Sequence, residues 1–137
     1  MKVENAVYPK GEQLTETVAK GVATPIVMLN LLKFKDKAVY KDGRADSASG
    51  REVYNRYGDD MLKFVQSHGG RVLFMGEIKS LVIGDVEEMW DVVALVEYPS
   101  SEAFVKIAMS PDVAKFGVHR EAGLMGQLLI QCVQGRA

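Results

Sequence analysis

Residues 25–35 have the sequence Pro-Ile-Val-Met-Leu-Asn-Leu-Leu-Lys-Phe-Lys, and the other elements are best placed around this segment. The run is mostly apolar, follows a proline and is short for a core helix, so it predicts a strand buried on both faces. A buried amide needs hydrogen-bond partners, protein or ligand, which makes Asn30 the first residue of interest. Strand alternation places Asn30 on one face with Ile26, Met28, Leu32 and Phe34.

The next element is a helix with a recognisable start. Ser49-Gly-Arg-Glu52 has the spacing of a capping box, and an apolar stripe of helical period follows it. These features predict a helix from Ser49 to about His68, with Tyr57 on the apolar stripe and Tyr54 off it. Two glycines at 69–70 end this helix.

Two strands are predicted after the helix. Residues 71–83 and 90–98 alternate apolar side chains with others, and a turn at Gly84-Asp85 separates them. This arrangement is typical of an antiparallel hairpin.

The C-terminal part is predicted to hold a helix, a loop and a last strand. Ser100 caps the helix, and Ser110-Pro111 starts a short helical piece after it. Residues 117–124 have the composition of a polar loop, and residues 127–133 form an apolar strand.

The element order predicts an α+β fold of the ferredoxin-like type. Strand, helix, strand, strand, helix, strand is the βαββαβ arrangement, with an antiparallel sheet ordered 4-1-3-2. Residues 1–24 are expected to be a short N-terminal helical extension, and residues 25–137 a single domain. Two helices cover only one face of such a sheet, while several strands are apolar on both faces. A homodimer that pairs the uncovered faces is therefore expected.

Composition and charge exclude several classes of function. The chain has 137 residues, 47% hydrophobic and 26% charged, as in soluble globular proteins. Its 17 basic and 18 acidic residues give a net charge of -1, so neither nucleic acid nor a membrane is an expected partner. We expect a cytoplasmic protein for three reasons. Cys132 is the only cysteine, no apolar run reaches transmembrane length, and no signal peptide is visible.

Neither a metal nor a cofactor is expected. The only histidines, His68 and His119, lie far apart in the sequence. No carboxylate–histidine spacing of a known metal site is present, and no phosphate loop or dinucleotide motif occurs.

Four segments, taken in order, resemble a known bacterial family. They are Val27-Met-Leu-Asn-Leu-Leu-Lys-Phe34, Gly69-Gly-Arg-Val-Leu-Phe74, Trp90-Asp-Val-Val-Ala-Leu-Val-Glu-Tyr-Pro99 and His119-Arg-Glu-Ala-Gly-Leu124. They are similar to the family catalogued as domain of unknown function 1330, from about residue 25 onward. The resemblance implies a dimeric α/β barrel. Relatives in that superfamily include cofactor-free monooxygenases, isomerases, haem enzymes and stress-response proteins, so the resemblance implies a fold without selecting an activity.

Three polar residues are candidates for catalysis. Asn30 can orient a substrate carbonyl or oxyanion from the sheet, or it can simply bond a neighbouring protein group. His119 can act as an acid or base, and Arg120 can clamp a carboxylate. There are two alternatives for this pair: both residues lie in a solvated loop, or Arg120 is held by Glu121.

Three further residues are candidates for ligand binding. Tyr57 can present its phenol to a ligand, or it can be a core tyrosine whose hydroxyl reaches the surface. Trp90 can stack on a ligand or pack within the protein. Glu97 can act as a general base, or it can pair with Arg71 or Lys33.

Two functional hypotheses follow. The first is a small-molecule-binding protein with a pocket between sheet and helices, possessing metal-free chemistry of a monooxygenase or isomerase type. The second is a non-catalytic dimeric binding or stress-associated module, in which the polar groups only satisfy one another. A pocket with unpaired polar groups would favour the first hypothesis, and mutually bonded groups the second.

Overall fold

The computed structural model describes residues 1–135 and contains four helices and a four-stranded antiparallel sheet. Their bounds, in chain order, are α1 Gly11–Ala19, β1 Ile26–Phe34, α2 Gly50–Ser67, β2 Arg71–Glu77, β3 Val92–Tyr98, α3 Ser101–Ala108, α4 Pro111–Gly123 and β4 Leu124–Val133.

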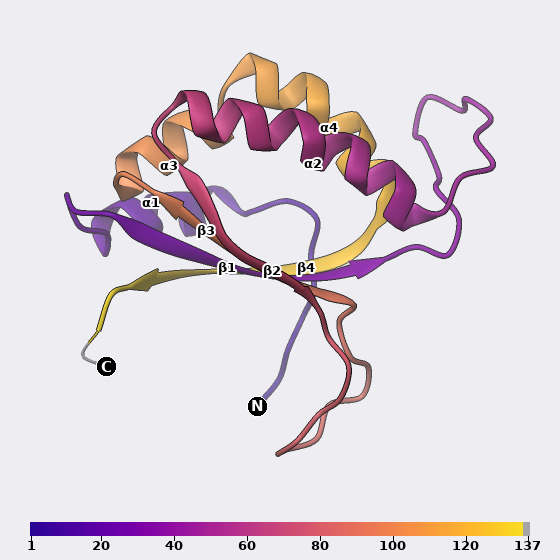
Figure 1. Ribbon diagram of the computed structural model, residues 1–137, viewed down its shortest axis with the longest axis horizontal. Coiled ribbons are helices and arrows are strands. Elements are labelled where there is room, and N and C mark those ends of the chain that lie inside the picture. Colours follow the sequence, from indigo (N-terminus) through magenta and orange to yellow (C-terminus); the bar gives the residue numbers. More distant parts are fainter. Residues whose placement is uncertain (136–137) are drawn as a thin grey trace.

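The sheet has the strand order β2-β3-β1-β4, which is the predicted 4-1-3-2 order read from the other edge. Strand β1 pairs antiparallel with both β3 and β4, and Asn30 lies opposite Ala94 and Leu129. Helices α2, α3 and α4 cover one face and leave the other bare of helices (Figure 1). The ferredoxin-like α+β prediction is confirmed by this topology.

The two faces of β1 differ in burial as strand alternation requires. Ile26, Met28, Leu32 and Phe34 point to the helices and are at most 8% exposed. Val27, Leu29 and Leu31 point to the helix-free face and are only partly buried. Asn30 shares the helix-covered face, as predicted, and is itself partly buried.

Helix α2 begins where the sequence places it. The Ser49 hydroxyl accepts a hydrogen bond from the Glu52 amide at 3.1 Å, which confirms Ser49 as the cap. A Cβ on Gly50 would lie 2.2 Å from the Lys35 carbonyl oxygen and 2.6 Å from that of Gly123. The start of α2 and the end of α4 therefore approach each other at backbone distance, and only glycine fits there.

Strands β3 and β4 start at Val92 and Leu124 and not at the predicted residues 90 and 127, and two other elements differ more from the prediction. The expected loop at residues 117–124 is wrong, because α4 continues to Gly123 and carries His119 and Arg120 on a helix. The expected strand Arg71–Ile83 ends at Glu77. The Ile78 amide donates to the Asp91 carbonyl and closes the ladder there, so residues 79–90 lie beyond the paired strands.

The chain on either side of the sheet also shapes the molecule. Residues 78–91 drop away from the sheet on its helix-free side (Figure 1) and expose Val82 and Ile83. Residues 5–8, the N-terminal segment, join the β4 edge through a backbone bridge between Ala6 and Gln127. Among residues 1–135, no helix is both long and apolar enough to cross a membrane.

Candidate functional site

A chain of polar side chains crosses the helix-covered face of the sheet. The Asn30 Oδ1 accepts from the Gln127 Nε2 at 2.8 Å, and the Gln127 Oε1 accepts from an Arg120 Nη2 at 2.6 Å. The Asn30 amide nitrogen donates to the backbone oxygens of Met28 and Ala94, both at 3.3 Å. This amide–guanidinium chain brings two predicted site residues, Asn30 and Arg120, together through Gln127, a residue that the sequence analysis did not single out.

Three tyrosines lie on the same side of the sheet, of which Tyr98 is buried and Tyr54 and Tyr57 are partly buried. Burial raises the pKa of Tyr54, Tyr57 and Tyr98 above the ordinary value of 10.0. Their phenols interact electrostatically, since Tyr57 also raises the pKa of both Tyr54 and Tyr98. The positive charge of Arg120 opposes this rise in the pKa of Tyr54 and Tyr57 but does not cancel it. The Tyr54 and Tyr57 rings are direct neighbours; we call Tyr54, Tyr57 and Tyr98 the phenol cluster.

The phenol cluster differs from the other two tyrosines because its hydroxyls have no hydrogen-bond partner in the protein within residues 1–135. Among residues 1–135, no side chain or backbone group forms a hydrogen bond with any of its three hydroxyls. The other two tyrosines both have partners: the Tyr8 hydroxyl donates to Glu121, and the Tyr40 hydroxyl bonds His119. Within residues 1–135 these three oxygens are not among the buried side-chain atoms that lack a partner, so solvent reaches them and either water or a ligand can hydrogen-bond to them.

The ring contacts show how the cluster is held. The Tyr54 ring lies 5.2 Å from Phe34 and 5.3 Å from Tyr57, centroid to centroid. The Tyr98 ring packs edge-on against Phe104 at 5.0 Å. Tyr54 and Tyr57 come from successive turns of α2 and Tyr98 from the end of β3, so the cluster spans a helix and the sheet.

The Arg120 guanidinium has unusual surroundings. Within residues 1–135 it joins no ion pair, and its neighbour Glu121 pairs with Lys41 and Tyr8 instead. The Tyr8 ring of the N-terminal segment lies 5.7 Å from the guanidinium carbon. Lys41 and Tyr8 lower the pKa of Glu121, against the effect of its burial. The alternative in which Glu121 holds Arg120 is therefore wrong.

His119 belongs to a different network. Its Nδ1 lies 2.7 Å from the Tyr40 hydroxyl, which also accepts from Arg56 at 3.1 Å. Arg56 in turn donates to Asp46 at 2.7 Å. The structure thus places His119 and Arg120 in separate hydrogen-bond networks, although they are adjacent in sequence.

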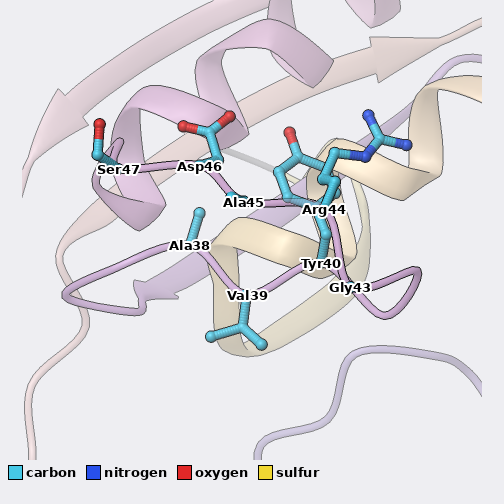
Figure 2. Close-up of a pocket in the computed structure, with 8 residues that line it drawn as sticks. All are labelled: Ala38, Val39, Tyr40, Gly43, Arg44, Ala45, Asp46 and Ser47. Carbon is cyan, nitrogen blue, oxygen red and sulfur yellow. The ribbon is translucent and has the colours of Figure 1, made fainter.

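This second network borders an open hollow of about 670 Å³. Figure 2 shows its lining, with the Tyr40 ring and the Arg44 side chain close together and Val39 turned the other way. The Arg44 guanidinium stacks on Tyr40 at 4.4 Å and pairs with Asp42. The charges that border this hollow already have partners, Arg44 in Asp42 and Asp46 in Arg56 of α2, which makes the hollow a weaker candidate for a ligand.

The remaining predicted residues lie elsewhere. The Trp90 indole donates to the Asn5 side chain at 2.6 Å, just before β3. Glu97 accepts from Arg71 at 3.0 Å, which bears out the pairing alternative. Strand alternation places Glu97 on the helix-free face, away from Asn30. Neither residue meets the amide–guanidinium chain.

A second hollow, of about 450 Å³, lies among α2, α3 and the start of α4 and includes Phe64, His68 and Lys106. Neither hollow includes the phenol cluster. In residues 1–135, no group of three or more His, Cys, Asp or Glu side chains is placed to hold a metal ion.

Solved structures similar to this chain support the same architecture. A protein of unknown function from Rhodopseudomonas palustris, a structural genomics target, is 30% identical, with a TM-score of 0.87 over 98% of this chain and 100% of that one. The methylated form of that protein is 32% identical over 96% of both chains, also with a TM-score of 0.87. A protein from Arabidopsis thaliana shares only the fold, at 14% identity and a TM-score of 0.54 over 82% of this chain and 97% of that one.

Comparison by sequence gives the family. No curated protein matches the chain. The family described as "Domain of unknown function (DUF1330)" matches residues 43–134, which span α2 to β4. This protein belongs to the DUF1330 family.

Proposed function

We propose that this protein binds a small molecule on the helix-covered face of its sheet, between the phenol cluster and the amide–guanidinium chain. The observation that supports the proposal is a set of three tyrosines, partly or fully buried, whose hydroxyls have no hydrogen-bond partner in the protein within residues 1–135. A ligand oxygen that displaces water from such a hydroxyl forms its hydrogen bond in largely apolar surroundings, where that bond is stronger than in open water.

The same residues suit metal-free chemistry of an isomerase or monooxygenase type. Both reaction types can pass through an enolate or a similar oxyanion of the substrate. Neutral phenols and a guanidinium are the donors that stabilise such an oxyanion in a site with little water. Arg120 and Tyr57 are the proposed oxyanion donors, and Asn30 positions Arg120 through Gln127. The proposal assigns no catalytic role to His119, and no ligand contact to Trp90 or Glu97.

A second candidate function is a non-catalytic dimeric binding or stress-associated module. It is favoured by the mutual bonding of Asn30, Gln127 and Arg120, which leaves the amide oxygens satisfied without a ligand. The partly buried apolar residues of the helix-free face favour the homodimer in either case. The unpartnered phenols have no role in this candidate, which is why we prefer the first.

Removing single hydroxyls tests the proposal. Tyr57→Phe removes a hydroxyl that has no protein partner in residues 1–135, so the free energy of unfolding should change by less than about 0.5 kcal/mol. Tyr40→Phe is the matched control: it removes the hydroxyl that bonds His119 and Arg56, and should cost about 1–2 kcal/mol. Urea unfolding measures both values. Equal losses in the two variants would count against an unpartnered phenol at position 57.

A ligand is sought by thermal shift with a metabolite library, since a ligand that binds the folded state raises the melting temperature. A hit that stabilises the wild type and Tyr40→Phe but not Tyr57→Phe supports binding at the phenol cluster. Hits that stabilise Tyr57→Phe and a Tyr54→Phe variant as well as the wild type would place binding elsewhere and reject the proposed site.

A further inference from the structure

We propose that the N-terminal segment, residues 5–8, is a cover that opens while the sheet stays folded, and that its opening gives solutes access to Arg120 and to the edge of β4. This inference goes beyond the proposed function, because it concerns how this part of the sheet is reached and not what binds there. It holds whether or not a ligand binds at the phenol cluster.

Strand β4 leaves room for the segment at one residue. A Cβ on Gly126 would lie 2.6 Å from the Asn5 Cβ, and the three nearest atoms outside residues 125–127 all belong to Asn5. Only glycine at this position therefore lets Asn5 lie against the strand. Beside this contact, the Ala6 N–H donates to the Gln127 backbone oxygen at 3.2 Å, and the Gln127 N–H donates back at 2.9 Å. The segment thus extends the antiparallel pairing by one bridge at the outer edge of the sheet.

The remaining contacts of the segment are polar and lie at the surface. The Asn5 Oδ1 accepts from the Trp90 indole at 2.6 Å, and the Tyr8 hydroxyl donates to Glu121 of α4. Three of the four residues are exposed and Val7 is partly buried, and none of the four belongs to a core cluster. Surface hydrogen bonds exchange readily with water, whereas a segment that buries apolar side chains opens only when its core opens. The segment can therefore detach without loss of the core.

The closed segment lies on the end of the amide–guanidinium chain. The Tyr8 ring is 5.7 Å from the Arg120 guanidinium carbon, and Ala6 occupies both backbone groups of Gln127. The Gln127 side chain in turn bonds Arg120 at 2.6 Å and Asn30 at 2.8 Å. Detachment removes the ring from the guanidinium and frees one N–H and one C=O of the β4 edge. The open state therefore presents a cation beside two free backbone hydrogen-bonding groups.

Hydrogen exchange of single backbone amides, followed by NMR on the full-length protein, tests the opening. The Gln127 amide bonds only the segment, whereas the next amide, that of Leu128, points to the opposite edge and so toward β1. In the wild type the Gln127 amide should be protected, but at least about tenfold less than the Leu128 amide, because it exchanges through local opening.

Two variants favour the open state by different means. Gly126→Ala displaces Asn5 by a steric clash, and Tyr8→Ala removes the ring beside Arg120 and the bond to Glu121. Each should lower the protection of the Gln127 amide about 10-fold or more and leave that of Leu128 unchanged. Gly58→Ala is the matched control, since nothing lies within 4 Å of its Cβ, and should change neither amide. Tyr8→Ala alters an exposed side chain and keeps the test decisive should Gly126→Ala fold poorly.

Chemical modification tests what the segment covers. Phenylglyoxal reacts with accessible guanidinium groups, and mass spectrometry of peptides gives the rate at each arginine. The rate at Arg120 should rise in Gly126→Ala and in Tyr8→Ala. The rate at Arg44, an exposed side chain paired with Asp42, is the internal reference and should stay constant.

Three results overturn the inference. If the Gln127 and Leu128 amides are equally protected and lose protection together in the variants, the segment opens only with the sheet. If the Gln127 amide is unprotected in the wild type, the closed state is not formed. If Arg120 reacts at the wild-type rate in variants whose Gln127 amide has lost protection, the segment does not cover the guanidinium.

Discussion

Asn30 is the residue that links sheet and helix in the polar chain. Its side-chain oxygen accepts from Gln127, which is 8% exposed and in turn accepts from Arg120. Asn30→Leu removes that acceptor and strands the Gln127 amide among apolar neighbours, so the free energy of unfolding should fall by about 1–3 kcal/mol. Urea unfolding at neutral pH gives the value. Should the variant match the wild type in stability, Gln127 must have another acceptor, and the positioning role of Asn30 would be withdrawn.

The sequence singled out Asn30 as a candidate site residue, but it did not single out Gln127, the side chain that bonds Asn30. A single amide in an apolar strand stands out, because its polarity must be satisfied. Gln127 was read as part of an apolar run, and Tyr54 was placed off the apolar stripe of α2 although its ring packs on Phe34. Hydrogen bonds between residues 30 and 127 are contacts across the sheet, which periodicity along the chain does not encode.

Helix α2 contains two glycines whose surroundings are opposite. Gly58 has nothing within 4 Å of where a Cβ would lie, so the helix surface is open at that point. Gly58→Ala should therefore raise the free energy of unfolding by about 0.5–1 kcal/mol, through helix propensity alone. Gly50→Ala is the contrast, since its Cβ would lie 2.2 Å from the Lys35 carbonyl oxygen, and it should cost roughly 1–3 kcal/mol.

Thermal or urea unfolding of both variants checks this pair. Because they make the same chemical change in the same helix, any difference between them comes from tertiary contact. Loss of stability in Gly58→Ala would show that the helix surface at that point is not open.

Elements with strong local signals were predicted well, and elements defined by distant contacts were not. The caps Ser49, Ser100 and Ser110 each accept a helix N–H, as their positions before the helices indicate. Helix α4 was shortened because Gly117 and Gly123 suggested a loop, yet Gly123 is there to let α4 meet Gly50. Strand β2 was made too long because its apolar pattern continues past Glu77, where the partner strand has already ended.

At the scale of the whole molecule, the helix-free face of the sheet is the feature that most needs a partner. Leu29, Leu31, Leu95, Leu128 and Ile130 lie on this face by strand register. Ile130 is 46% exposed, and Phe74 of the neighbouring strand β2 is 54% exposed. A second copy of the same face would bury both surfaces with one self-complementary contact, of more than ~1,000 Å² in total.

We therefore predict a homodimer, with Leu95→Lys as the variant that breaks it. Leu95 belongs to β3, a central strand, and a lysine there would have to be buried unpaired in the interface. Light scattering on a chromatographed sample should give twice the chain mass for the wild type and the single-chain mass for Leu95→Lys. Met109→Lys is the control, since Met109 is 69% exposed beyond α3 and should not change the mass. A wild type of single-chain mass at micromolar concentration would refute the dimer.

The contact between Trp90 and Asn5 has an optical consequence. The chain contains one tryptophan, and its indole N–H is held by the N-terminal segment at 2.6 Å. Tryptophan emission therefore arises from a single fluorophore. The polarity of its surroundings and its quenching depend on whether the N-terminal segment is bound against it. The same segment carries the Tyr8 ring beside the Arg120 guanidinium. Tryptophan fluorescence therefore reports, without a label, whether Tyr8 is in place beside Arg120.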